Sequence, residues 1–170
     1  MAEIRIAPGF AGHRSLVRLR VAMPDAGRAA AQMQLPTEPL RWAGADPVAM
    51  WVSPDQWLLA SAAGSPEQLI RRCEIVLGDI LHHATDASDA LICIVVEGAG
   101  ARGLLAMLSG VDFDATRLWA GQCVRTRMAK VAVLVRALDN DRFELFVDRS
   151  VGEYLERWLR RCACDPIHSD

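Results

Sequence analysis

A glycine-rich segment in the middle of the chain is the first candidate for chemistry. Residues 98–103 read GAGARG, which matches the G-x-G-x-x-G pattern of dinucleotide-binding loops and follows an apolar, β-branched stretch. Such a site also needs an acidic residue about 20 positions later to hold the ribose, and residues 119–127 contain none. The pattern therefore favours a tight strand-to-helix turn, with a nucleotide site as the alternative.

Two cysteines near the end of the chain are candidate metal ligands. Cys162 and Cys164 precede Asp165 and His168, and two thiolates with an imidazole can bind zinc. A closed structural zinc site needs four ligands, usually with two or more residues between the cysteines. Because one residue separates these two, and because Cys162 also falls on the apolar stripe of an expected helix, the pattern favours unreactive thiols at a helix end.

Two other polar groups have both a catalytic and a structural interpretation. His82 and His83 follow an expected helix, whose last turn favours positive charge, so we interpret them as a helix-end pair. Asp86 and Asp89 flank Ser88 and could act as an acid-base pair if they faced a pocket. Asp and Ser are also the usual residues of turns, and we expect a turn here.

Three residues in the last third of the chain form a candidate partner interface. Arg125 and Arg127 would project from one face of an expected strand, a few residues after Trp119. Arginine and tryptophan are enriched among the residues that contribute most to protein–protein binding. Solvated surface arginines are the alternative. No Ser-His-Asp or Cys-His arrangement has signature spacing, so we assign no catalytic, cofactor-binding or metal-binding residue.

Hydrophobic periodicity predicts the elements that would position these residues. The segment Ser65–Gln68 is a capping box that predicts the start of a helix. Ser150 and Glu153 predict another helix in the same way, with Tyr154 and Trp158 on its apolar stripe. The other expected elements are helices at 26–33 and 101–108 and strands at 15–21, 48–52, 56–60, 90–97, 124–128, 131–135 and 143–147.

The order of these elements predicts the fold class. Strand-helix-strand-strand-helix occurs approximately twice, which indicates an α+β fold of two ferredoxin-like halves with helices on one face of a mainly antiparallel sheet. We expect an N-terminal arm over residues 1–14 and a single α+β domain over 15–170, with possible sub-halves at 15–81 and 84–164.

Composition excludes several classes of function. The chain has 170 residues, 21 acidic and 19 basic, and a net charge of −2, which disfavours nucleic-acid binding. No apolar run approaches the roughly 20 residues of a membrane span; the longest covers 90–96. Five cysteines, an odd number, and an N-terminus without a signal-peptide pattern predict free thiols in a reducing cytoplasm.

Four segments carry a resemblance to a known family. They read WVSPDQWLL at 51–59, DASDA at 86–90, RTRMAKVAVL at 125–134 and FELFVDRSVGEYLERWL at 143–159. Their order and spacing, from about residue 16 to residue 160, resemble the small gamma subunit of heterotetrameric bacterial sarcosine oxidase. That family is related to the glycine-cleavage aminomethyltransferase, whose folate-binding domains are α+β. Of the Lys-Gly-Cys-Tyr-x-Gly-Gln-Glu signature of the iron–sulfur-repair branch, only Gly121-Gln122 is present.

The resemblance implies an accessory subunit of a complex. Such a complex oxidatively demethylates sarcosine to glycine, with formation of methylene-tetrahydrofolate and hydrogen peroxide. The implied partners are larger alpha and beta flavoprotein subunits and a small delta subunit, and the resemblance places FAD, FMN, NAD, tetrahydrofolate and zinc in those partners. The resemblance also implies that this chain carries no cofactor and is not catalytic by itself. The alternative is a stand-alone folate-binding protein of the aminomethyltransferase superfamily.

Overall fold

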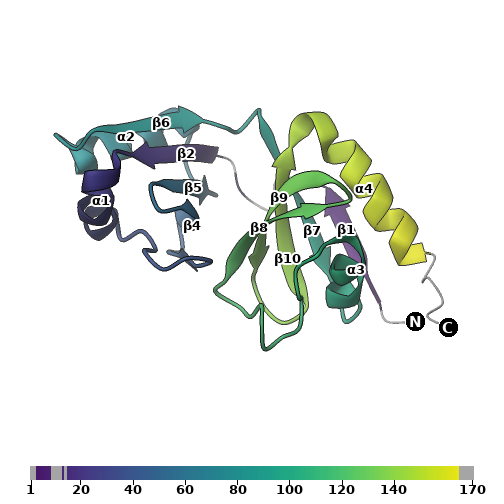
Figure 1. Ribbon diagram of the computed structural model, residues 1–170. Helices are drawn as coiled ribbons and strands as arrows, with labels where there is room; N and C mark the ends of the chain where they lie inside the picture. The colour runs from purple at the N-terminus through teal and green to yellow at the C-terminus, as the bar shows by residue number, and fades with distance from the viewer. Residues whose placement is uncertain (1–2, 9–12, 14, 165–170) are drawn as a thin grey trace. The chain divides into compact units, whose positions relative to one another are not determined.

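The computed structural model describes residues 3–8, 13 and 15–164, and the chain divides into two compact units. The first unit comprises residues 12–91, and the second comprises residues 1–11 and 92–170. Each unit combines a five-stranded sheet with helices (Figure 1), which confirms the predicted α+β class. Within the described residues, no helix has both the length and the apolar character that a membrane crossing requires.

The first unit is built on a sheet with the strand order β3-β4-β5-β2-β6, in which each neighbouring pair runs antiparallel. Its strands are β2 (Ser15–Val21), β3 (Trp42–Ala43), β4 (Val48–Ser53), β5 (Gln56–Ser61) and β6 (His82–Asp86). Its helices are the 3-10 helix η1 (Met23–Asp25), α1 (Ala26–Met33) and α2 (Pro66–Leu77).

The core of the first unit lies where α1 and α2 pack on one face of the sheet. Period-two alternation in β2 places Val17, Leu19 and Val21 in this core, together with Leu69 and Cys73 of α2. The capping box predicted at the start of α2 is confirmed. The backbone N–H of residue 68 donates to the hydroxyl of residue 65, and the amide oxygen of residue 68 accepts from the backbone N–H of residue 65.

The second unit has a sheet with the order β1-β7-β10-β9-β8, in which β1 and β7, β10 and β9, and β9 and β8 pair antiparallel. Its strands are β1 (Arg5–Pro8), β7 (Leu91–Glu97), β8 (Cys123–Met128), β9 (Val131–Ala137) and β10 (Arg142–Asp148). Its helices are α3 (Ala101–Leu108) and α4 (Arg149–Cys164).

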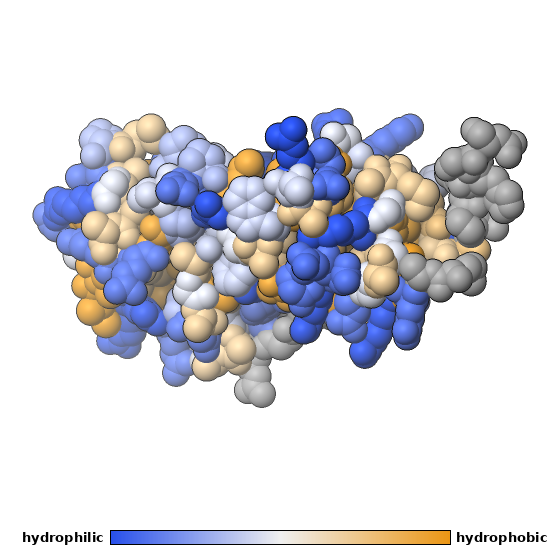
Figure 2. Space-filling view, turned by 90° about the horizontal axis from the view of Figure 1, so that it is seen from below, coloured by the Kyte–Doolittle hydropathy of each residue, from blue (hydrophilic) through white to orange (hydrophobic). Residues whose placement is uncertain are grey.

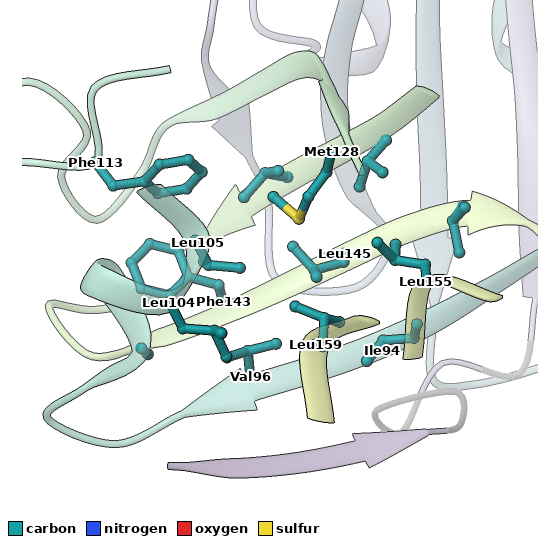
Figure 3. Packing of buried hydrophobic residues seen from close by; sticks show 14 of the residues in the cluster. Ile94, Val96, Leu104, Leu105, Phe113, Met128, Phe143, Leu145, Leu155 and Leu159 are labelled. Carbon is teal, nitrogen blue, oxygen red and sulfur yellow. The ribbon is translucent and has the colours of Figure 1, made fainter. Parts of the chain in front are cut away.

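The core of the second unit joins both helices to the sheet (Figure 3). Leu104 of α3 and Leu159 of α4 pack against inward-facing strand residues such as Leu145. Phe113, in the loop after α3, meets Phe143 of β10 edge to face with ring centroids 5.9 Å apart. The core therefore fixes the loop that leads to β8 as well as the helices.

Three strands differ from the sequence prediction, and all are short or at a sheet edge. His82 and His83 begin β6 and are not a helix-end pair, because α2 already ends at Leu77. Among the described strands, β6 pairs with β2 alone. Its residues are polar or partly exposed on both faces, so it lacks the alternation that marks a strand. Part of the expected N-terminal arm lies outside the described residues, but residues 5–8 of it form β1. Strand β3 has two residues.

The predicted capping box of the last helix is also wrong. Helix α4 begins at Arg149, one residue before the expected cap, and Ser150 is already helical. The Asp148 carboxylate accepts hydrogen bonds from both the backbone N–H of Ser150, at 2.9 Å, and its hydroxyl, at 2.6 Å. The carboxylate therefore satisfies a backbone donor of the first turn in place of the serine hydroxyl.

Candidate functional site

The candidate interface arginines lie on β8, an edge strand of the second unit. Met128 points into the core, whereas Arg125 and Arg127 are exposed, as alternation along a strand requires. Their guanidinium groups therefore share one face of β8, as predicted. Within the described residues neither side chain has a hydrogen-bond or ion-pair partner, so both are available to a carboxylate on another molecule.

Trp119 lies in the turn that enters β8 and is 42% exposed. The backbone N–H of Trp119 donates to the side-chain oxygen of Gln122, at 3.0 Å, and the backbone N–H of Gln122 donates to the Trp119 carbonyl, at 3.2 Å. Because Gln122 is buried, these two bonds fix the turn. Trp119 precedes the strand that carries the arginines, and their joint role as an interface stays a prediction.

Arg102, the arginine of the glycine-rich segment, holds the loop that leads to Trp119. Its Nη1 donates to the carbonyls of Phe113, at 2.6 Å, and Leu118, at 2.8 Å, and its Nε donates to the carbonyl of Asn140, at 2.5 Å. The guanidinium carbon also lies 5.1 Å from the centre of the Phe143 ring. Arg102 is the anchor of this surface, and sequence reasoning missed it because its partners are backbone carbonyls of distant residues.

The glycine-rich segment forms the predicted strand-to-helix turn between β7 and α3. Gly98 has φ +115°, and a Cβ built on it would meet the Glu3 carbonyl oxygen at 2.1 Å. The backbone N–H of Gly100, at the start of α3, donates to that same carbonyl at 3.5 Å. Because Gly98 has no side chain, the N-terminal segment at Glu3 can pack directly against its backbone.

The remaining sequence candidates occupy separate places. Cys162 packs at the edge of the second core and Cys164 is exposed, while His168 lies outside the described residues. Among the residues described, no three His, Cys, Asp or Glu side chains gather as metal ligands would. Asp86 forms the predicted turn, since its Oδ1 accepts from the Ser88 backbone N–H at 2.8 Å.

A buried ion pair and a buried thiol lie within the second sheet. Arg136 Nη1 donates to Glu144 Oε2 at 2.9 Å. Burial lowers the pKa of Arg136 from its ordinary value, and the Glu144 carboxylate opposes this shift. Burial raises the pKa of Cys93, and the same carboxylate adds to that rise. Cys93 is thus kept protonated, which makes it unreactive.

Helix α4 presents an exposed aromatic pair that the sequence analysis placed on the buried stripe. Tyr154 and Trp158 are 45% and 38% exposed, and their rings meet edge to face with centroids 6.4 Å apart. The Arg161 guanidinium lies 6.0 Å from the centre of the Trp158 ring. The buried side of α4 is formed by Gly152 and Leu155 with Leu159, so the aromatic residues lie on its outer side.

Comparisons with known proteins agree on one family. The family model described as the sarcosine oxidase gamma subunit family matches residues 20–165. Among solved structures, a heterotetrameric sarcosine oxidase from Corynebacterium sp. U-96 has a chain similar to this one, with a TM-score of 0.84 and 20% identity over 98% of this chain and 87% of that chain.

A second similar structure is the glycine cleavage system aminomethyltransferase T from Bartonella henselae, with a TM-score of 0.64 and 13% identity over 93% of this chain and 45% of that chain. At these identities the two structures confirm the fold, including the predicted likeness to the aminomethyltransferase. Comparison with curated proteins found no match. Because the family model matches most of the length of this chain, the chain belongs to the sarcosine oxidase gamma subunit family.

Proposed function

We propose that this chain is a non-catalytic gamma subunit that docks on larger alpha and beta flavoprotein subunits, with a small delta subunit completing the complex. The family match over residues 20–165 carries this proposal. The similar Corynebacterium chain comes from a heterotetrameric enzyme, and this chain covers 87% of it. That coverage supports a gamma subunit of corresponding size in a complex of the same kind.

The proposed complex converts sarcosine to glycine, with formation of methylene-tetrahydrofolate and hydrogen peroxide, in the cytoplasm. FAD, FMN, NAD, tetrahydrofolate and zinc are assigned to the partner subunits. The roles of three buried or strongly hydrogen-bonded groups in this chain support the assignment of the cofactors to the partner subunits. Arg102 binds loop carbonyls, Arg136 pairs with Glu144, and Cys93 is kept protonated by burial. Each of these interactions lies within the group's own unit.

The exposed residues of the second unit are of the types that bind other proteins. Arg125 and Arg127 present two guanidinium groups on one strand face, and Tyr154 and Trp158 present an aromatic pair on a helix. Arginine, tyrosine and tryptophan dominate the binding energy of many interfaces. We propose the β8 face, defined as Trp119, Arg125 and Arg127, as one docking surface of the subunit.

Co-expression with the larger subunits, followed by size-exclusion chromatography, tests this function. The chain is expected to elute with the large subunits, and Arg125→Glu or Arg127→Glu to weaken that association about tenfold or more. Arg18→Glu on β2 is the control, because it makes the same charge change at an exposed arginine without an ion-pair partner among the described residues. Elution of the wild-type chain apart from the large subunits would contradict the proposal.

The alternative is a folate-binding protein that acts alone, which the aminomethyltransferase-like fold favours. It requires the isolated chain to bind tetrahydrofolate. A calorimetric titration of the isolated chain distinguishes the two functions, because an accessory subunit is expected to give no binding heat at millimolar ligand. Saturable binding by the isolated chain would support the alternative.

A further inference from the structure

The first unit contains a cavity whose lining includes no residue of the β8 face. Its volume is about 540 Å³, which is within the range of about 300–1,000 Å³ that small-molecule pockets occupy. The walls come from the end of α1, from residues 43–47 at the end of β3 and in the loop before β4, and from the outer side of α2. Met33, Leu35 and Leu59 form the apolar part of its lining, and Gln32, Gln34, Asp46 and Arg72 form the polar part.

The loop wall of this cavity is held in place by the sheet. Gly44 has φ +87°, and a Cβ there would lie 2.6 Å from the Pro47 carbonyl oxygen, so this turn requires glycine. One carboxylate oxygen of Asp46 accepts from the hydroxyl of Ser61, at 2.5 Å, and from the backbone N–H of Ala62, at 3.2 Å. Because these bonds tie the loop to β5 and the residue after it, the cavity is preformed.

The helix wall continues into an exposed surface. Arg72 and Val76, one turn apart on α2, line both the cavity and a shallower hollow of about 250 Å³ formed with Arg71 and Ile75. Ile75 is 73% exposed and Val76 is 37% exposed. Hydrophobic residues also reach the surface at the left of Figure 2, where α1 and α2 lie. We call Arg71, Arg72, Ile75, Val76 and the cavity beside them the α2 groove.

The charge of the α2 groove indicates what would bind there. Within the described part of the chain, neither Arg71 nor Arg72 has an ion-pair or hydrogen-bond partner for its side chain. Asp46, which also lines the cavity, already accepts two hydrogen bonds. No carboxylate of the described residues forms an ion pair with either arginine, and an aliphatic surface lies beside them. A complementary molecule would therefore supply both a carboxylate and an apolar group.

We propose that the α2 groove is a docking site for a segment of a larger partner subunit, in which an apolar side chain next to a carboxylate fills the cavity and pairs with Arg72. A polypeptide fits better than a small molecule because the apolar surface extends beyond the cavity, over Ile75, and exposed apolar surface beside charged residues is typical of protein contacts. This inference rests on the proposed function and adds a second contact, on the first unit.

Two variants test the groove in the co-expressed complex. Arg72→Glu reverses the charge at the cavity rim, and Ala45→Trp places an indole in the loop wall. Each is expected to lower the apparent affinity for the larger subunits about tenfold, as loss of a central contact does. The controls are Arg18→Glu, at an exposed position on β2, and Ala106→Trp, on the exposed side of α3. Thermal unfolding of each purified variant verifies that its fold is retained.

The outcomes separate this inference from the function on which it rests. Weakened association of both groove variants, with unchanged controls, supports it. Wild-type affinity of both groove variants overturns it while the proposed function stands. If the wild-type chain does not join the larger subunits, the proposed function fails and the groove assignment fails with it. If the isolated chain dimerises and Arg72→Glu abolishes the dimer, the occupant is a second copy and the proposal is overturned.

Discussion

Arg136 and Glu144 form a salt bridge inside the second sheet, with Nη1 of the arginine 2.9 Å from Oε2 of the glutamate and side chains only 7% and 4% exposed. The two residues are direct partners in the antiparallel ladder of β9 and β10. Cys123 of β8 is the partner of Arg136 on its other side. Two opposite charges at neighbouring positions can remain buried because each replaces the interactions with water that the other loses on burial.

Removal of one member of this pair is expected to destabilise the protein strongly. Arg136→Met leaves the Glu144 carboxylate buried without this guanidinium, which should lower the free energy of unfolding by about 3–5 kcal/mol. Urea denaturation monitored by tryptophan fluorescence measures the change. The double variant Arg136→Met/Glu144→Leu is expected to recover much of the loss, because no charge then remains buried. Equal stability of the single and double variants would contradict this account.

Arg102 should be essential for the order of the loop that carries Trp119. Arg102→Ala removes donors to the carbonyls of Phe113 and Leu118, and we expect it to lower the free energy of unfolding by about 2–4 kcal/mol. Hydrogen exchange should increase at residues 113–122. Arg125→Ala is the matched control and should change stability by less than about 0.5 kcal/mol, because that side chain is exposed. Unchanged exchange in Arg102→Ala would refute the anchoring role.

Two glycines of the GAGARG segment, Gly98 and Gly103, should respond in opposite directions to substitution by alanine. Gly98→Ala forces a Cβ against the Glu3 carbonyl at positive φ, so a loss of more than about 1 kcal/mol is expected. Gly103 is helical, and a Cβ there meets no atom within 4 Å. Gly103→Ala should therefore stabilise the protein by about 0.5–1 kcal/mol. Thermal unfolding distinguishes these effects, and destabilisation by Gly103→Ala would contradict the structural role assigned to this segment.

The buried thiols should make stability fall at alkaline pH. Burial raises the pKa of the Cys73 thiol from its ordinary value to about 11, so the folded state keeps its proton where the unfolded state loses it. Because the folded state then binds more protons, the free energy of unfolding should fall as the pH rises above about 9 and level off above the folded pKa. Urea denaturation from pH 8 to pH 11 measures this slope. Cys73→Ala should reduce this slope, and an unchanged slope in that variant would contradict the role of the buried thiol.

Sequence patterns identified the elements whose signals are local. The cap at Ser65 was predictable because its partner is three residues away, and β2 because its apolar residues alternate. The cap at Ser150 was mispredicted because Asp148, two residues earlier, binds the same donor. Strand β6 was missed because its pairing with β2 is long-range and its residues carry no apolar face.

The site was predictable only in part for the same physical reason. Alternation placed Arg125 and Arg127 on one face of β8, which the structure confirms. Arg102 gave no signal because it binds backbone carbonyls 11, 16 and 38 residues away, and carbonyls are present at every residue. The α2 groove depends on how α1, α2 and residues 43–47 pack together, and this packing leaves no local signal in the sequence.

Native mass spectrometry of the co-expressed complex tests whether this chain is a subunit that carries no cofactor. We expect the 18.6 kDa chain to be present in a complex with larger subunits. On dissociation it should be released at the mass of the bare polypeptide, while the flavin mass stays with the partners. Absence of the chain from the complex, or its release with a bound flavin or folate, would contradict the account.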